Sequence, residues 1–233
     1  MEFTGFRPEG LDLLIQNRLM NSKDFYEAHK PEIKKLALEP FYALCERMTP
    51  AMLEIDPLFV TVPSRMVSRV RRDTRYTKDK TLYRANTWLF FRRSKQTYES
   101  VPAYYMEVTP DDWGFGCYGA YGQGEMAVIR EMILRGDKLF LDAYEAVQAE
   151  TGFTLSGEQF KRPKHPDAPA EYQPWLNRKE LVVDRRISDD FEPLFDASFV
   201  DPMLDAFRRL APFYHLLQTV HERVRMTGSG AVR

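Results

Sequence analysis

The chain of 233 residues is 44% hydrophobic and 29% charged, which is typical of a globular protein whose core is large enough to need no disulfide bonds. Its net charge of −1 excludes a chain that is basic throughout, and the lack of any run of about 18 apolar residues excludes a hydrophobic membrane span. Two cysteines and an N-terminus without the pattern of a signal peptide predict a reducing, cytoplasmic location and no membrane partner.

Helical signals come first along the chain. Residues 10–20 have the pattern of a short amphipathic helix, and Ser22 is a suitable N-cap for a second helix. Pro31 and Pro40 interrupt the pattern that follows, because proline either begins a helix or bends it. We therefore expect residues 23–54 to form one broken helical arm.

Strand signals replace the helical ones from Phe59. Segments rich in β-branched and aromatic residues alternate between apolar and polar side chains, and short turns such as residues 110–112 separate them. The predicted strands cover residues 59–70, 86–94, 101–110 and 112–122. Short connections between neighbouring strands favour an antiparallel sheet.

Helical periodicity returns after Gly122. Residues 123–134 predict a helix that ends at Gly136. Asp137 is a suitable N-cap for the next helix, which should run to about Ala149.

The last part of the chain predicts a proline-rich loop at residues 152–176, a fifth strand at 179–187 and a C-terminal helix capped by Asp201. Pro212 should bend this helix. The apolar residues of one helix face are Leu204, Phe207, Leu210, Tyr214, Leu217 and Val220.

This order of elements predicts an α+β fold, an antiparallel sheet flanked by N-terminal and C-terminal helices. The sheet should contain residues 59–122 and 179–187. We expect one domain over residues 1–226 and a flexible, glycine-rich tail at 227–233.

Positive charge is concentrated in one stretch, residues 64–95, which we call the basic segment. It holds eleven basic and two acidic side chains, a charge of +9, which leaves 22 basic and 32 acidic residues, or −10, for the rest of the chain. Such self-repulsion must be offset either by carboxylates from elsewhere in the fold or by a bound anion.

Residues 71–83, RRDTRYTKDKTLY, resemble the signature RDxRFSKDKxPY of the DUF2461 family. The stretches FTGF at 3–6, NSKDFY at 21–26 and PKHPDAP at 163–169 are also similar to that family, and the resemblance extends over most of the chain. Leu82 departs from it, since a proline is common at that position. Members of the family are proteins of unknown function, so the resemblance implies no catalytic residue.

The predicted site is a pocket for the phosphate or carboxylate group of a small molecule. Arginine presents a planar fork that suits such anions, lysine adds a point charge, and aromatic rings supply flat surfaces nearby. On a strand, Arg65 and Arg69 share one face and Arg72 lies on the other, so Arg72 joins the pocket only if the strand ends or bulges there. The predicted ligand-binding residues are Arg65, Arg69, Arg72, Asp73, Arg75, Lys78, Lys80, Tyr83, Arg84, Trp88, Tyr105, Lys164 and His165.

Three other interpretations of the basic segment stay open. It could be a solvated surface whose cations pair with the acidic remainder, or a nucleic-acid-binding module that neutralises phosphates and stacks bases. It could also dock an acidic partner or a second copy of the chain without catalysis. The acidic remainder argues against a long duplex footprint. The sequence predicts neither a reaction nor an oligomeric state.

Other motifs give weaker signals. His165 lies beside Lys164 in the proline-rich loop and would act as an acid–base group or phosphate donor if that loop folded over the sheet. The four histidines are scattered and no HExxH or CxxC motif occurs, so no metal is expected. The glycine-rich residues 114–122 match no nucleotide-binding loop, so no cofactor is expected, and we interpret these glycines as sites of close backbone approach and Cys117 as a core residue.

Overall fold

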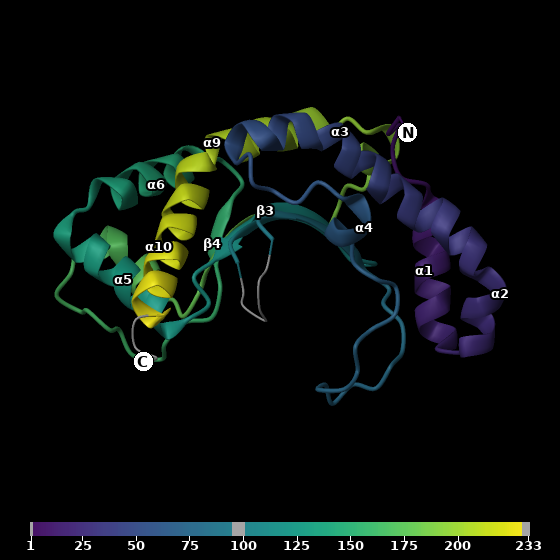
Figure 1. Cartoon of the computed structure of the whole chain (residues 1–233), viewed down its shortest axis with the longest axis horizontal. Coiled ribbons are helices and arrows are strands. Elements are labelled where there is room, and N and C mark those ends of the chain that lie inside the picture. The colour runs from purple at the N-terminus through teal and green to yellow at the C-terminus, as the bar shows by residue number, and fades with distance from the viewer. Residues whose placement is uncertain (1, 95–100, 230–233) are drawn as a thin grey trace. The chain divides into compact units, whose positions relative to one another are not determined.

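The computed structural model describes residues 2–94 and 101–229, which form two compact units (Figure 1). The fold is α+β, as predicted, with helices flanking a five-stranded antiparallel sheet of order β1-β2-β3-β5-β4. The strands are β1 (Thr87–Arg92), β2 (Ala103–Val108), β3 (Trp113–Gly119), β4 (Thr154–Ser156) and β5 (Leu181–Ile187). Four of them confirm predicted strands, whereas β4 lies in a stretch that the sequence analysis interpreted as loop.

Unit 1 consists of Met1–Phe91, Tyr105–Gly114 and Arg186–Leu204. Its helical elements are α1 (Pro8–Met20), α2 (Lys23–Ile33), the π-helical turn η1 (Lys34–Leu38), α3 (Glu39–Ile55), α4 (Pro63–Met66) and α8 (Glu192–Asp196). The Ser22 hydroxyl accepts a hydrogen bond from the Phe25 backbone N–H at 3.4 Å, which confirms the predicted cap of α2. The broken arm is also confirmed, because Pro31 lies inside α2 and the π-helical turn follows at once.

The predicted strand at residues 59–70 is wrong. Proline lacks a backbone N–H and is confined to the edges of sheets, and Pro63 instead begins the short helix α4. Beyond α4 the chain makes only isolated bridges among the described residues, Val67 with Leu89 and Arg71 with Tyr83. Alternation of apolar side chains alone did not reveal this, since the extended residues after α4 have the same period as a strand.

A long loop of unit 1 carries five of the eleven basic residues of the basic segment. We call residues 71–83 the basic loop; in Figure 1 it is the blue loop that extends away from α4. Its ends are joined by backbone hydrogen bonds, Arg72 N–H to Leu82 O at 2.8 Å and Arg84 N–H to Val70 O at 2.9 Å. Lys95, the last residue of the basic segment, lies outside the described residues.

A small hydrophobic core anchors the basic loop to the N-terminal helices. It contains Leu13, Leu14, Ile33, Ala37, Val70 and Tyr83. The Tyr26 ring stacks on the Tyr83 ring with centroids 4.8 Å apart, and the Leu82 backbone N–H donates to the Asn21 side-chain oxygen at 2.7 Å. Asn21 follows the last turn of α1 with a left-handed φ of 46°, a conformation that asparagine tolerates better than most residues.

Unit 2 consists of Arg92–Tyr104, Phe115–Arg185 and Asp205–Arg233. Its helices are α5 (Gln123–Arg135), α6 (Lys138–Ala149), the 3-10 turn η2 (Ala170–Tyr172), α7 (Gln173–Leu176) and α10 (Ala211–Ser229). Helix α10 packs against α5 and α6 (Figure 1). The predicted stop at Gly136 is confirmed by its left-handed φ of 64°, and Asp137 caps α6 by accepting from the Leu139 N–H at 2.9 Å.

The C-terminal helix differs from the prediction in two respects. Asp201 is not its cap, because α9 (Val200–Arg209) already begins one residue earlier. Pro212 does not bend one helix; it lies in the first turn of α10, where its missing N–H costs nothing. The six residues predicted for one helix face are all buried, but they are divided between α9 and α10, with Leu210 between the two helices: Leu204, Phe207, Leu210, Tyr214, Leu217 and Val220.

Glycines of β3 allow the close backbone approach that the sequence predicted. A Cβ atom at Gly116 would lie 2.3 Å from the Val183 carbonyl oxygen on the neighbouring strand β5. Only glycine fits at such a contact. Helix α10 continues through Ser229, while residues 230–233 lie outside the described part, so the single domain and the flexible tail stay predictions.

Candidate anion-binding site

Unit 1 contains a cavity of about 430 Å³ that three arginines line, Arg18, Arg72 and Arg84. Tyr83, Asn86 and the turn between β2 and β3 also line it. We call this cavity the arginine recess. It brings together residues from α1, from both ends of the basic loop and from the β2–β3 turn, which are far apart in sequence.

Asp79 holds two of these arginines in place. Its carboxylate accepts from Arg18 Nη2 at 3.3 Å and forms a short ion pair with Arg72 Nη1, which also donates to the Thr81 hydroxyl. Hydrogen bonds from Thr81, and then from Arg72, hold the pKa of the Asp79 carboxyl below its usual value. The carboxylate therefore stays charged at neutral pH and fixes both guanidinium groups at the wall of the recess.

Two arginines of the recess have N–H groups without an acceptor. Arg18 Nη1 and Arg84 Nε are buried, and neither has a hydrogen-bond partner within residues 2–94 and 101–229. Burial, and then the charge of Arg72, lowers the pKa of Arg84. A buried donor left unpaired costs about 1–3 kcal/mol, but these two nitrogen atoms are covered and do not themselves border the recess.

Arg84 lies against an aromatic ring. Its Cζ atom lies 4.5 Å from the centroid of the Trp88 ring, within the range of a cation–π interaction. In the described part of the chain no carboxylate lies within ion-pair distance of Arg84, although the more distant charge of Glu107 partly opposes the lowering of its pKa.

The recess gathers Arg72, Tyr83 and Arg84 of the predicted ligand-binding residues, and Trp88 contributes through Arg84. Tyr105 does not line it. The strand prediction placed Arg72 on the opposite side from the other cations, but because no strand forms there, Arg72 is free to point into the recess.

The remaining predicted cations lie outside the recess. They are exposed to solvent: Arg65, Arg69, Arg75, Lys78 and Lys80. Arg75 forms an ion pair with Asp73, Nη2 to Oδ2 at 2.7 Å, and hydrogen bonds from Arg75 lower the pKa of the Asp73 carboxyl to about 2. Lys80 donates to the Thr74 carbonyl oxygen at 2.8 Å.

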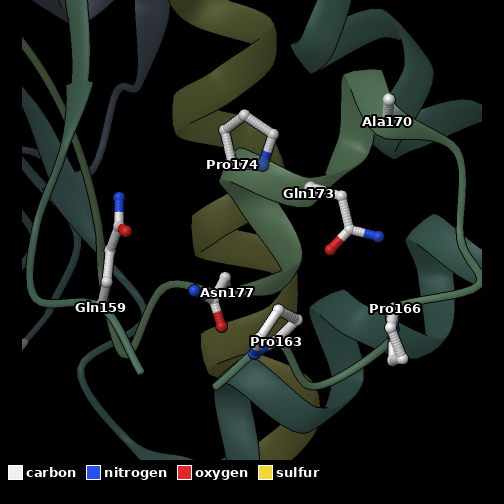
Figure 2. Close-up of a pocket in the computed structure, with 7 residues that line it drawn as sticks. All are labelled: Gln159, Pro163, Pro166, Ala170, Gln173, Pro174 and Asn177. Carbon is white, nitrogen blue, oxygen red and sulfur yellow. The ribbon is translucent and has the colours of Figure 1, made fainter. Parts of the chain in front are cut away.

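The structure places Lys164 and His165 in unit 2, in another cavity. That cavity has a volume of about 1030 Å³ and is lined by α5, the loop around Phe160 and the beginning of β5. A smaller cavity of about 530 Å³ shares the same loop, and Figure 2 shows it lined by prolines and by the carboxamides of Gln159, Gln173 and Asn177.

Arg18 is the residue of the recess that sequence reasoning missed. It lies in the last turn of α1, and no motif links it to the basic loop, since the two meet only through tertiary packing 61 residues apart in sequence. Asn21, three residues later, belongs to the stretch 21–26 that resembles the DUF2461 family. This resemblance was the only feature of the sequence that pointed to the end of α1.

The two cysteine thiols are poorly suited to act as nucleophiles. Cys45 and Cys117 are buried free cysteines, and burial raises the pKa of Cys45 to about 12 and that of Cys117 well above its usual value, so neither is a ready nucleophile. Across the described residues, no three histidine, cysteine or acidic side chains are grouped so as to hold a metal ion. None of the described helices is both long and apolar enough to cross a bilayer.

A family model described as "Conserved hypothetical protein (DUF2461)" matches residues 9–216, which include the basic loop and every residue of both sites described above. The match confirms the resemblance noted in the sequence. No curated protein matches the chain significantly.

Proposed function

From the premise that the chain belongs to the DUF2461 family of conserved hypothetical proteins, we propose that it binds the phosphate or carboxylate group of a small molecule in the arginine recess. One observation carries this proposal. Arg18, Arg72 and Arg84 line the same recess, and among the described residues no carboxylate lies within ion-pair distance of Arg84.

The chemistry of the recess suits a small monoanion. Three arginines face two carboxylates, Asp79 and Asp111, which leaves a formal charge of +1. A volume of about 430 Å³ falls within the usual range of small-molecule sites. The guanidinium forks supply charge-assisted hydrogen bonds, and we assign no catalytic residue, so both a binding protein and an enzyme are compatible with the site.

The test is the affinity of inorganic phosphate and of a panel of sugar phosphates and organic acids, measured by calorimetry. Arg84→Gln should weaken binding of the best anion about tenfold or more, because it removes a charge at the wall of the recess and its donors. Arg65→Gln removes the same charge from an exposed position of the basic segment and should leave the affinity unchanged.

Equal losses of anion affinity in the two variants would contradict the proposal, since the binding would then depend on the total positive charge of the basic segment and not on the recess.

A single-stranded oligonucleotide in the same titration distinguishes the nucleic-acid alternative. Tyr76 is 89% exposed on the basic loop beside exposed lysines, an arrangement that favours that alternative. Binding that is tight for the oligonucleotide, absent for small anions and steeply weakened by salt would replace the pocket with a nucleic-acid surface.

A further inference from the structure

The cavity of about 1030 Å³ in unit 2 has an apolar wall that is open to solvent. Helix α5 supplies Met126, Ala127 and Leu134, and Tyr121 precedes the helix. Leu134 is 51% exposed and Tyr121 is 42% exposed, although both are large apolar side chains. We call this space the Phe160 cavity. Large exposed apolar side chains grouped in one concave site are typical of ligand binding.

Three cations surround the Phe160 ring in this cavity. Lys164 Nζ lies 4.3 Å, Arg130 Cζ 5.3 Å and Lys179 Nζ 5.6 Å from the ring centroid. Two of them are engaged elsewhere. Arg130 donates to the Leu176 carbonyl oxygen at 2.9 Å, and Lys179 forms a short ion pair with Glu158.

Lys164 is the cation at Phe160 for which the described residues provide neither an ion-pair partner nor a hydrogen-bond acceptor. The acidic residues of the lining are occupied: Glu131 pairs with Arg135, Glu158 with Lys179, and Glu180 accepts from the Glu158 backbone N–H. Within the described ranges, 2–94 and 101–229, no carboxylate pairs with Lys164, and the ring of the adjacent His165 makes no hydrogen bond.

The loop that carries these groups is rigidly held. Phe160 and Asn177 exchange two hydrogen bonds, Phe160 N–H to Asn177 O at 3.0 Å and Asn177 Nδ2 to Phe160 O at 3.0 Å. Gln173 Nε2 donates to the His165 carbonyl oxygen at 2.6 Å and to that of Ala168 at 3.0 Å. Figure 2 shows Gln173, the first residue of α7, and Asn177, which directly follows α7, beside the loop segment that contains Pro163 and Pro166. The carboxamides thus preorganise the loop, which lowers the entropic cost of binding.

We propose that the Phe160 cavity is a second binding site, which takes a free aliphatic carboxylate with its head group at Lys164 and His165 and its chain along Met126 and Leu134. A single available cation beside a concave apolar wall suits a molecule with one negative charge and an apolar body. The site is independent of the arginine recess, because every residue that lines it belongs to unit 2.

Calorimetry with decanoate tests this assignment. Decanoate should bind at least about tenfold more tightly than decanol, which lacks the charge, and than acetate, which lacks the chain. Lys164→Gln should weaken decanoate binding about tenfold, and Leu134→Asn should also weaken it, since both side chains line the cavity. Lys161→Gln is the matched control, because Lys161 is exposed on the same loop and does not line the cavity.

Each outcome decides the proposal. Loss of affinity in Lys164→Gln with none in Lys161→Gln supports it, provided that both variants unfold at the temperature of the original chain. No measurable decanoate binding, equal affinity for decanol, or equal losses in the two lysine variants overturns it. The arginine recess is tested with inorganic phosphate, which has no aliphatic chain, so a failure here is distinguishable from a failure of the arginine recess.

A membrane lipid offers the same chemistry from another source. Co-sedimentation with vesicles of phosphatidylglycerol, compared with vesicles of phosphatidylcholine, separates the two. Binding to the anionic vesicles without binding to monomeric decanoate would overturn the assignment of a free acid.

Discussion

A single glycine fixes the loop of the Phe160 cavity. Gly157 has a φ of 111°, and a Cβ atom there would lie 2.8 Å from the Glu180 carbonyl oxygen on the segment that leads into β5. Gly136 has a φ of 64° at the end of α5 but no heavy atom within 4 Å of the same position. The two glycines therefore differ in two respects: Gly157 has the more strained φ for an L-residue, and it alone has a close contact at the Cβ position.

We expect Gly157→Ala to lower the free energy of unfolding by about 3 kcal/mol and Gly136→Ala by about 1 kcal/mol, because only the first adds a steric contact to the strained conformation. Urea unfolding of the two variants measures both values. If Gly136→Ala destabilised the chain as much as Gly157→Ala, the close contact with Glu180 would carry no energetic weight.

The segment that leads into the basic loop, residues 59–70, departs furthest from its prediction. Alternating residues predicted a strand there, yet the described residues form the short helix α4 and isolated bridges such as Val67 with Leu89. Side-chain alternation and capping residues did predict the elements that depend on neighbouring residues in the sequence. These are the strands β1, β2, β3 and β5 and the capped helices α2 and α6. Such local features could not reveal the conformation of the basic loop, which depends on Asp79 and on contacts with α1.

Limited proteolysis tests how this loop is held. Trypsin should cleave the native chain first at Arg75, Lys78 or Lys80, because these residues are exposed between the two joined ends of the loop. Asp79→Asn should speed cleavage several-fold, since the Asp79 carboxylate accepts from the Thr81 N–H at 2.9 Å and pairs with Arg72.

Asp73→Asn is the matched control for that experiment. Asp73 lies in the same loop, but its ion pair among the described residues is a local one with Arg75, two residues away. It should change the cleavage rate less than Asp79→Asn does. First cuts within helices α5 or α10, or equal acceleration in both variants, would mean that Asp79 does not organise the loop.

At the scale of the molecule, several carboxylates are held in their charged form by hydrogen bonds. The pKa of the Asp112 carboxyl is lowered chiefly by its hydrogen bond from Arg186, and those of Asp73, Asp79 and Asp196 are lowered by neighbouring donors. A carboxyl whose folded pKa lies below its unfolded value stabilises the fold above the unfolded pKa, and this contribution is lost as the pH falls toward the folded pKa.

The melting temperature should therefore change little from pH 7 to about pH 5 and then decline between about pH 4 and pH 2. Asp112→Asn should make this acid-side decline shallower, since it removes one of the shifted groups. Asp111→Asn is the control, because no side chain in the described residues donates a hydrogen bond to the Asp111 carboxylate. Equal curves for both variants would show that the Arg186 pair does not contribute to acid stability.

The candidate sites show where sequence reasoning stops. The charge of the basic segment predicted an anion site, and the structure assembles a recess from Arg72 and Arg84, which flank that loop. Arg18 joins them only through the packing of α1, a contact between residues 61 positions apart. Lys164 and His165 were predicted as part of the same pocket but line a cavity of the other unit, because nothing local in a sequence states which distant surface a loop will meet.

The hydrogen bond from the Leu82 backbone to Asn21 has a practical consequence. It links the C-terminal end of α1 to the C-terminal end of the basic loop. Arg18 lies in the first of these segments, and Arg84 directly follows the second. The exchange rate of one amide proton, that of Leu82, thus reports whether helix and loop remain joined. An anion that draws Arg18 and Arg84 together should slow this exchange in heavy water, giving a label-free signal of occupancy without any knowledge of the ligand's identity.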